Sequence, residues 1–235
     1  MRQRIGGIVF RLFLRPRFDG FLVPGRAAES LLESFGVDLG RIRRGMYAAS
    51  PDVFKPDHDP ARASARRVLY VGQLIERKAV DVLVEAFGEV RTRLPDAELR
   101  LVGDGPLCDV REPGVIVTPF SDSETVAQLM KECTVFVLPS RLDHWGVVVH
   151  EAALCGSPLV VSNMVGARHE LVSRENGRVV DAGNATELAE ALERMLQLDQ
   201  ESWHRMSKAS AAAADRITPD DWIDAVLDLC RRSRR

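Results

Sequence analysis

From Arg66 onward the sequence alternates between short apolar runs and stretches with helical apolar spacing, and this alternation restricts the fold strongly. The runs are rich in β-branched residues and nearly continuous: 68–71, 99–102, 115–117, 135–138, 159–161 and 179–180. Such runs are typical of strands that are buried on both faces, as in a parallel sheet. Apolar residues between them recur with helical spacing, first at Val80, Leu83, Val84, Phe87 and Val90. The pattern predicts an α/β fold in which right-handed βαβ units form a doubly wound parallel sheet.

The flanking segments differ from this alternating part. Residues 52–65 are rich in Pro, Asp and Ala, so we expect a linker there. Before it, residues 18–24 resemble a strand, and residues 26–35 a helix with Gly36 as its C-terminal cap. This piece is too small for a domain and matches the closing βα unit of a larger one. A last helix is indicated by apolar residues at helical spacing, Trp222, Ile223, Val226 and Leu229.

The charge balance argues against a nucleic-acid partner. The formal net charge is −2, whereas a domain that neutralises phosphates is clearly basic. We expect the arginines that gather at the two ends to be solvated, and contact with an anionic membrane surface is the alternative. These are Arg2, Arg4, Arg11, Arg15 and Arg17, and Arg231, Arg232, Arg234 and Arg235.

The cysteines and the apolar stretches indicate a cytoplasmic location, with peripheral contact at the inner face of the membrane as the alternative. The cysteines contain no C-x-x-C pair, which argues against a zinc or redox site and fits a reducing compartment. No apolar stretch approaches the roughly 20 residues that span a bilayer. Residues 5–14 are apolar but are interrupted by Arg11, and no small-residue cleavage site follows them.

Two turns at strand ends carry glycines next to polar residues. Ligands of doubly wound sheets bind beyond the carboxyl ends of the strands. After the first run, Gly72 and Gln73 are followed by Arg77 and Lys78. Lys78 lies near the next helix N-terminus and could bind a phosphate, although an ordinary basic turn has the same composition.

After the second run, Gly103 and Gly105 would allow a ribose or ring to approach the backbone. A plain tight turn explains these two glycines equally well.

The turn after the fourth run is the most informative. Gly146 begins a predicted helix, and the free N–H groups of Gly146 and Val147 would form an anion site suited to a diphosphate. Glu151 follows about one turn later and could accept two hydrogen bonds from a ribose diol. Its apolar neighbours argue against a freely solvated surface carboxylate, which is the alternative. Asp143 precedes the helix and could accept from hydroxyls at the other end of the ligand.

The remaining candidates indicate support for this site and no metal. Residues 162–167 follow the next strand, where they either complete the diphosphate pocket or only begin a helix. His144 and His150 lack the spacing of a zinc motif, so both are expected to be structural or peripheral. No Walker A loop, G-x-S-x-G elbow or G-x-G-x-x-G fingerprint is present. We therefore expect neither a metal nor a cofactor.

These turns together resemble the retaining glycosyltransferases of the large family-four type, which have the GT-B fold of two Rossmann-like domains. The family pattern is P-S-x-x-E-G-F-G-x-x-x-x-E-A-x-A-x-G-x-P. The chain has P-S-R-L-D-H-W-G-V-V-V-H-E-A-A-L-C-G-S-P, with Asp143 and Glu151 as the two acids. Residues 72–78 resemble the family's G-R-L-x-x-x-K-G, and residues 102–106 its V-G-x-G-P. The resemblance extends from about Phe18 to the end of the chain.

The resemblance implies roles for these residues. Asp143 would lie near the donor sugar and Lys78 on the diphosphate, which makes them the expected catalytic residues. Glu151 would bind the donor ribose, and Gly146 and Val147 the diphosphate. The chain departs from the family at several positions, with Asp143 for Glu, Gln73 for Arg and Ala79 for Gly, and Arg77 could compensate for Gln73. The front of the N-terminal domain, which carries the acceptor site, has no counterpart in the chain.

The resemblance also implies a division of the chain. Residues 1–51 would be a remnant of the N-terminal acceptor domain, residues 52–65 a linker, residues 66–218 a Rossmann-like nucleotide-sugar-binding domain, and residues 219–235 a C-terminal crossover helix. The expected function is hexosyl transfer from a nucleoside diphosphate sugar such as a UDP-sugar, with retention, by the donor-binding half of an enzyme.

Two alternatives remain at this stage, an inactive nucleotide-sugar-binding module and a GT-B epimerase. The expected partners are the nucleotide sugar and a glycan or lipid-linked acceptor. A separately encoded N-terminal half or a second copy of the chain is a further expected partner. The apolar faces of residues 5–14 and of the last helix either pack on each other or remain exposed, and an exposed face would mark a partner surface or favour aggregation.

Overall fold

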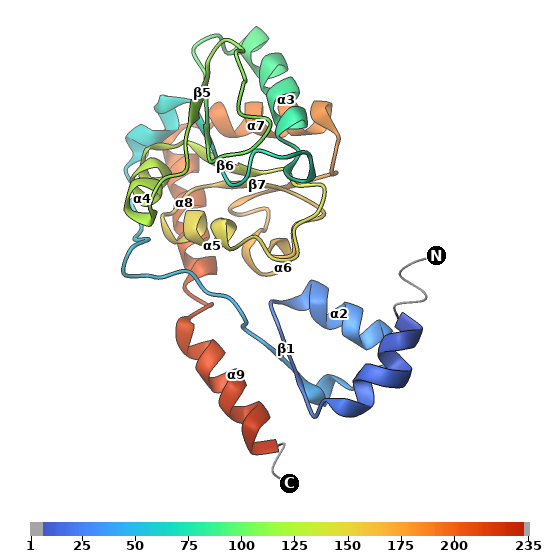
Figure 1. Cartoon of the computed structure of the whole chain (residues 1–235). Helices are drawn as coiled ribbons and strands as arrows, with labels where there is room; N and C mark the ends of the chain where they lie inside the picture. Colours follow the sequence, from blue (N-terminus) through green and yellow to red (C-terminus); the bar gives the residue numbers. More distant parts are fainter. Residues whose placement is uncertain (1–6, 233–235) are drawn as a thin grey trace. The chain divides into compact units, whose positions relative to one another are not determined.

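The computed structural model describes residues 7–232 of the chain (Figure 1). Contacts divide the chain into two compact units. The larger unit is Ala49–Arg216, and the smaller one combines Met1–Ala48 with Ile217–Arg235. The expectations for Arg2, Arg4, Ile5, Arg234 and Arg235 fall outside the described residues.

A parallel sheet of six strands forms the centre of the larger unit, in the order β5-β4-β3-β6-β7-β8. The strands are β3 (Arg67–Val71), β4 (Glu98–Val102), β5 (Val115–Thr118), β6 (Val135–Leu138), β7 (Leu159–Ser162) and β8 (Gly177–Val180). Every residue of β6 and β7 is buried, as expected for strands covered on both faces. Each predicted apolar run forms one of these strands, so the α/β fold with a parallel sheet is confirmed.

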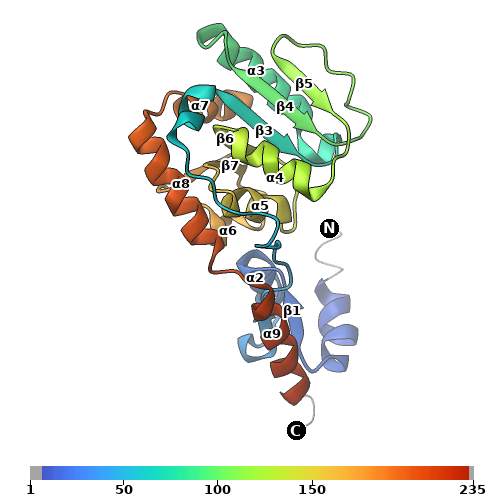
Figure 2. The same cartoon turned by 90° about the vertical axis from the view of Figure 1, so that its left-hand side faces the viewer.

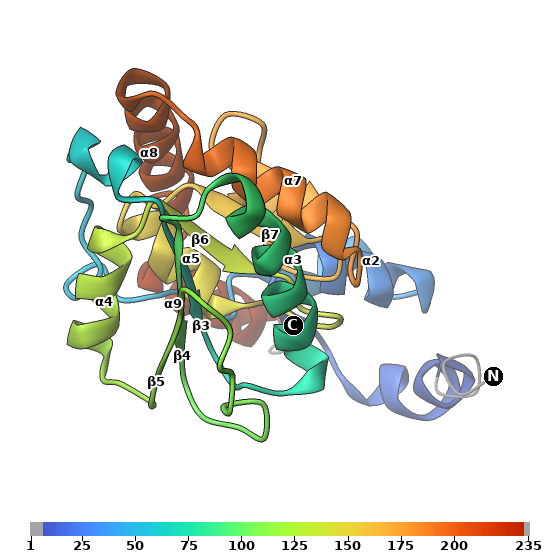
Figure 3. The same ribbon diagram turned by 90° about the horizontal axis from the view of Figure 1, so that it is seen from above.

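Helices cover both faces of the sheet (Figure 3). They are α3 (Val80–Arg93), α4 (Ser123–Glu132), α5 (Val147–Leu154), α6 (Arg168–Leu171), α7 (Ala185–Leu196) and α8 (Gln200–Ala214). Helices α3 and α7 pack together on one face, whereas α4, α5 and α8 lie on the other. The chain leaves β3 toward β4 but leaves β6 toward β7, so strand order reverses between β3 and β6. The loops after these two strands therefore meet at the topological switch point, where such sheets bind ligands.

Three helices of the larger unit, α4, α7 and α8, have N-termini capped by side chains. Asp122 caps α4 and Asp199 caps α8, and each accepts from an N–H three residues on, at 2.8 and 2.7 Å. Asn184 caps α7 in the same way by accepting from the N–H of Glu187 at 3.1 Å. The Glu187 carboxylate accepts from the Asp181 N–H at 2.8 Å and not from the Asn184 N–H, so the reciprocal hydrogen bond of a capping box is not formed.

Residues 52–65, expected as a linker, fall within the larger unit and end in the short helix η4 (Pro60–Ala65). Arg62 is 4% exposed, and its guanidinium donates to the carbonyls of Asp57, Met130, Cys133 and Cys155 and to the Ser157 hydroxyl. It also lies over the Trp203 ring, 4.8 Å from the centroid. The composition that predicted a linker conceals this buried arginine, whose charge is distributed over five acceptors.

The smaller unit contains a parallel pair of strands, β1 (Phe21–Val23) and β2 (Ile42–Arg44), with β2 not predicted from the sequence. Its helices are η1 (Phe10–Leu14), η2 (Arg15–Arg17), α2 (Arg26–Ser34), η3 (Leu39–Arg41) and α9 (Pro219–Arg232) (Figure 2). Val23, Val37 and Ile42 form its small core. Gly36 has the left-handed conformation expected after α2, with φ of 79°.

Apolar side chains remain exposed on two elements of the smaller unit. Leu12 and Phe13 of η1 are 65% and 56% exposed, and Trp222 and Ile223 of α9 are each 46% exposed. The predicted apolar stripe of the last helix is therefore only partly covered within this unit. Among the described residues, no helix combines the length and apolar character needed to cross a membrane.

Candidate functional site

The site lies where the loop after β3 meets the loop after β6. The first loop contains the turn η5 (Glu76–Lys78), which leads into α3. The Arg141 N–H donates to the Arg77 carbonyl at 2.9 Å, and the Arg77 guanidinium donates to the Leu142 carbonyl at 3.0 Å. Arg141 also pairs with Asp81 through two hydrogen bonds of 2.8 and 2.7 Å. These contacts join the two loops into one platform.

Lys78 and Asp143 form an ion pair across this platform. Their Nζ and Oδ2 atoms are 2.5 Å apart, and the side chains are only 14% and 12% exposed. The second Asp143 oxygen accepts from the Trp145 N–H at 3.4 Å. The structure thus brings together the two predicted catalytic residues, which are 65 positions apart in the sequence.

The loop before α5 is held by the loop after β7. The Asp143 N–H donates to the Met164 carbonyl at 3.1 Å, and the Asp143 carbonyl accepts from the Gly166 N–H at 2.9 Å. A Cβ on Gly166 would lie 2.1 Å from the His144 carbonyl oxygen, so only glycine fits there. Residues 162–167, which follow β7, therefore support the loop that precedes α5.

Gly146 gives α5 its start. It has a φ of 87°, in the left-handed region that disfavours residues with a Cβ. Within the described residues, the N–H groups of Gly146 and Val147 donate to no other group. Free N–H groups at a helix N-terminus attract anions, so this end of α5 can bind a phosphate group.

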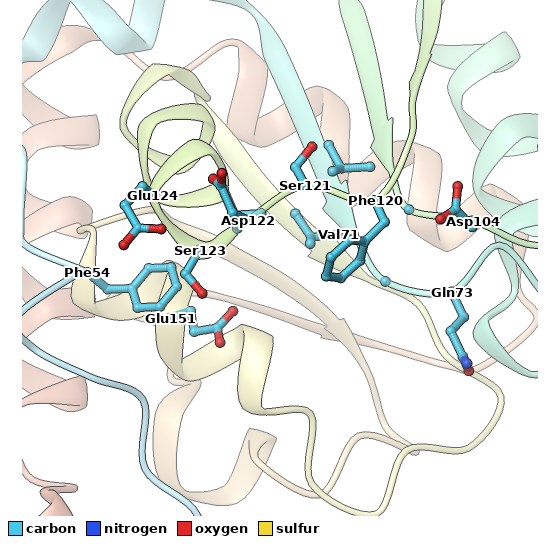
Figure 4. Close-up of a pocket in the computed structure, with 14 residues that line it drawn as sticks. Phe54, Val71, Gln73, Asp104, Phe120, Ser121, Asp122, Ser123, Glu124 and Glu151 are labelled. Atoms are coloured by element: carbon cyan, nitrogen blue, oxygen red, sulfur yellow. The ribbon is translucent and has the colours of Figure 1, made fainter.

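Glu151 lies half-buried on α5 and faces a cavity of about 770 Å³ (Figure 4). No hydrogen-bond donor or cation contacts its carboxylate within the described part of the chain. Burial raises its pKa to about 7, because desolvation disfavours the charged form. An unpartnered carboxylate at a cavity wall is available to accept hydrogen bonds from a ligand.

The floor of the cavity is made of backbone. A Cβ on Gly103 would lie 2.1 Å from the Gly72 carbonyl oxygen, and a Cβ on Gly105 would lie 2.3 Å from that of Leu74. The turns after β3 and β4 therefore touch each other directly. The Tyr70 hydroxyl supports this floor by donating to the Gln73 carbonyl at 2.7 Å, and burial together with the charge of Asp143 raises its pKa.

The predicted residues divide between the cavity and the platform. Gly72, Gln73, Gly103 and Glu151 line the cavity, whereas the other predicted site residues are not among its lining residues: Arg77, Lys78, Gly105, Asp143, Gly146 and Val147. Gly72 and Gly103 are therefore tightly packed backbone as well as cavity lining, whereas Gly105 is packed backbone only.

Sequence reasoning missed several lining residues. They are Phe54, Asp104, and the segment from Phe120 to Glu124. Phe120 is 79% exposed and lies two residues before Asp122, the capping residue of α4. An aromatic residue between a strand end and a helix start was a sequence signal that could have been used. Phe54 was placed in the expected linker. Figure 4 shows Glu151 and Ser123 toward one end of the cavity and Gln73 and Asp104 toward the other.

The two histidines near the site have different environments. His150 is buried, its Nδ1 accepts from the Ala49 N–H at 2.9 Å, and its Nε2 donates to the Ala214 carbonyl at 3.0 Å. Burial lowers its pKa, so it is a neutral structural residue. His144 is exposed. Within residues 7–232, no group of three or more His, Cys, Asp and Glu side chains is arranged to hold a metal ion.

The family follows from a comparison with known sequences. Residues 56–213 match the profile of the family described as glycosyl transferases group 1. The chain belongs to this family. A phosphatidyl-myo-inositol mannosyltransferase of Mycolicibacterium smegmatis is 30% identical to this chain. The match covers 95% of this chain and 60% of the relative. An alpha-D-kanosaminyltransferase of Streptomyces kanamyceticus is 28% identical over 81% of the chain and 54% of the relative. The chain thus spans about half the length of the curated relatives it matches.

Solved structures of glycosyltransferases share the fold. Anabaena Alr3699/HepE in complex with UDP and glucose gives a TM-score of 0.76 at 18% identity, covering 97% of this chain and 66% of that one. The sucrose-phosphate synthase of Thermosynechococcus elongatus gives 0.76 at 23% identity, covering 99% and 61%. These neighbours confirm the predicted GT-B, Rossmann-like architecture.

Proposed function

We propose that this chain is the donor-binding half of a retaining glycosyltransferase, which transfers a hexose from a nucleoside diphosphate sugar such as a UDP-sugar. Glu151 binds the ribose diol, and Lys78 with the N–H groups of Gly146 and Val147 binds the diphosphate. Asp143 acts near the donor sugar. The electrostatic stabilisation of the departing diphosphate accelerates the reaction.

The observation that carries this proposal is the Glu151 carboxylate. It faces a cavity large enough for a nucleotide, and it lies on the helix whose free N-terminus faces the neighbouring platform. A ribose offers two hydroxyl donors, and a carboxylate can accept both. One short helix thus places a hydroxyl acceptor and a phosphate site about one turn apart, as a nucleotide requires.

The charges near the platform support diphosphate binding without a metal. Lys78 supplies a cation, and the dipole of α5 adds partial positive charge at Gly146. Gln73 removes the arginine that the family resemblance implies, and Arg77 is exposed with its guanidinium on the Leu142 carbonyl. Lys78 is therefore the principal charged ligand of the diphosphate in this proposal.

The names of relatives bear on the partners. One relative is named as a transferase acting on phosphatidyl-myo-inositol and another as a kanosaminyltransferase. Anabaena Alr3699/HepE was solved with UDP and glucose. We propose a glycan or lipid-linked acceptor for the present chain. The apolar surface of η1 and the arginines of η1 and η2 are consistent with peripheral contact at a membrane.

Glu151→Ala tests the donor site. Losing both ribose hydrogen bonds should cost about 2–3 kcal/mol, or roughly a hundredfold in affinity. Calorimetry with UDP, GDP and ADP on the wild type identifies the nucleotide, and the variant is then titrated with the same one. Glu85→Ala, at an exposed position of α3, is the matched control. Equal measurable affinity in the wild type and in Glu151→Ala would contradict the ribose assignment.

We further propose that the purified chain binds donor but transfers little sugar alone. Acceptor positioning requires a second domain in the proposed mechanism, and orientation accounts for several kcal/mol of a barrier. A transfer assay with labelled nucleotide sugars, with and without an N-terminal half from a related enzyme, separates this proposal from an inactive binding module. Robust transfer by the chain alone would refute the need for the second half.

A further inference from the structure

Lys78, the proposed diphosphate ligand, already has an anionic partner. Its ammonium lies 2.5 Å from the Asp143 carboxylate, and both side chains are more than four-fifths buried. The chain has four lysines, Lys55, Lys78, Lys131 and Lys208, and among the described residues only Lys78 forms a salt bridge. The charge expected for the diphosphate is thus already neutralised by Asp143.

Both partners are fixed by their backbones. Asp143 pairs with Val165 in a parallel bridge, and its own N–H and carbonyl are both hydrogen bonded. Lys78 ends the turn η5, and the following residue, Ala79, has left-handed backbone with φ of 57°. Arg141 clamps the two loops together through Asp81 and the Glu76 carbonyl. The ion pair is therefore a built feature of the platform, unlike pairs between flexible surface side chains.

The incoming diphosphate must compete with Asp143 for Lys78. A carboxylate and a diphosphate repel each other at close range, and the repulsion is strong where water is largely excluded. An ammonium has three donors, so it can turn from one anion to another without leaving its place. Asp143, once released, has two oxygens free to accept hydrogen bonds.

We infer that Asp143 is the resting counter-ion of Lys78, and that the donor diphosphate takes Lys78 over and frees the Asp143 carboxylate for a hydroxyl of the donor sugar. This inference rests on the proposed function, since it assigns Lys78 to the diphosphate. Asp143 is a positioning residue while it pairs with Lys78, and it touches the substrate only after the exchange. Sugar recognition thereby depends on prior engagement of the diphosphate.

The variant Asp143→Asn distinguishes a counter-ion of Lys78 from a residue that only binds the sugar or only supports the structure. The change leaves an uncompensated, largely buried ammonium, which an anion would then neutralise. We expect affinity for inorganic pyrophosphate and for UDP to rise about tenfold, with a steeper dependence on salt. UDP-glucose should gain less than UDP, because the asparagine replaces an ionic acceptor for the sugar hydroxyl with a neutral one. Asp109→Asn, which removes an exposed carboxylate paired with Arg111, is the control and should leave the affinities for all three ligands unchanged.

The experiment is calorimetry with pyrophosphate, UDP and UDP-glucose on the wild type, Asp143→Asn, Lys78→Met and the double variant. If Asp143 acts through Lys78, the asparagine change has no effect on pyrophosphate affinity when Lys78 is already methionine. Unchanged pyrophosphate and UDP affinity in Asp143→Asn, with only UDP-glucose weakened, would leave Asp143 as a sugar ligand alone and overturn the inference. Uniform weakening of all three ligands would also overturn it, because that result indicates a merely structural role.

Lysine labelling tests the ion pair without any nucleotide. Trace acylation followed by peptide mass spectrometry reports the reactivity of each of the four lysines. We expect Lys78 to be acylated most slowly in the wild type. In Asp143→Asn its acylation rate should rise severalfold, while the rates of Lys55, Lys131 and Lys208 stay unchanged. An unchanged Lys78 would overturn the inference even if nucleotides bind. If the wild type binds neither pyrophosphate nor any nucleotide, the proposed function fails, while the labelling still decides whether Asp143 is the counter-ion.

Discussion

Glu151→Gln should stabilise the empty domain at alkaline pH and weaken nucleotide binding there, so that one substitution has opposite effects on folding and function. Burial raises the Glu151 pKa from its ordinary value of 4.5 to about 7. A carboxyl whose pKa is higher when folded stabilises the fold fully below the unfolded pKa, and this stability is lost as the pH rises through the folded pKa.

The size of the effect follows from the two pKa values. Each tenfold change in a dissociation constant corresponds to about 1.4 kcal/mol, so raising the pKa from 4.5 to about 7 costs the folded protein about 3 kcal/mol well above pH 7. Glutamine has the same shape and no charge, and therefore removes this cost. The gain should shrink steadily as the pH falls and be nearly absent at pH 4.5.

Urea denaturation of the wild type and Glu151→Gln at pH 4.5 and 8.5 measures the gain, and Glu85→Gln on the exposed side of α3 is the control. Calorimetry with UDP at pH 8.5 should show weaker binding by the variant, because an amide accepts fewer hydrogen bonds than an ionised carboxylate. Wild-type affinity should decline as the pH falls below about 7, where the carboxyl becomes protonated. A stability difference that is the same at both pH values would refute the reasoning, because it would mean that Glu151 is not desolvated.

Three further outcomes are expected. Gly146→Ala should lower stability by about 1–3 kcal/mol in thermal melts, because φ is 87° and the new Cβ would lie 3.1 Å from the Leu138 side chain. The control Gly183→Ala has a similar φ of 83° but open space around the new Cβ, so it should lower stability less. Arg62→Leu should lower the free energy of unfolding by about 3–5 kcal/mol, because it leaves buried carbonyls without a donor. The control Arg205→Leu removes an exposed ion pair on a helix and should lower it by less than about 0.5 kcal/mol. Similar losses in the two variants would contradict the role given to Arg62. Nucleotide affinity should be unchanged by a chelator, and affinity that vanishes with EDTA and returns with Mg²⁺ or Mn²⁺ would overturn the metal-free proposal.

The sequence predicted the six strands of the larger unit because their apolar runs are nearly continuous. Strand order was not predictable, since period and composition do not show that the chain turns back from β5 to pair β6 with β3. That reversal brings Lys78 to Asp143, so a contact across 65 positions depends on topology. Arg62 was missed for a related reason, because four of its five acceptors are backbone carbonyls, which leave no trace in the sequence.

The smaller unit shows a second limit of structure prediction from the sequence. Strand β2, Ile42–Arg44, has two arginines among three residues and no apolar run, so only its pairing with β1 identifies it. In the cavity, Gly72, Gly103 and Glu151 were predictable from strand ends, whereas Phe54 was not, because its neighbours have the composition of a loop.

The glycine floor of the cavity determines where ligand preference can evolve or be engineered. At Gly103 and Gly105 any side chain would collide with the facing carbonyls of Gly72 and Leu74. These positions cannot be varied to reshape the pocket without separating β3 from β4. Variation is better directed at the wall from Phe120 to Glu124, whose side chains are largely exposed. A library aimed at changing the accepted nucleotide should diversify this wall and leave the floor untouched.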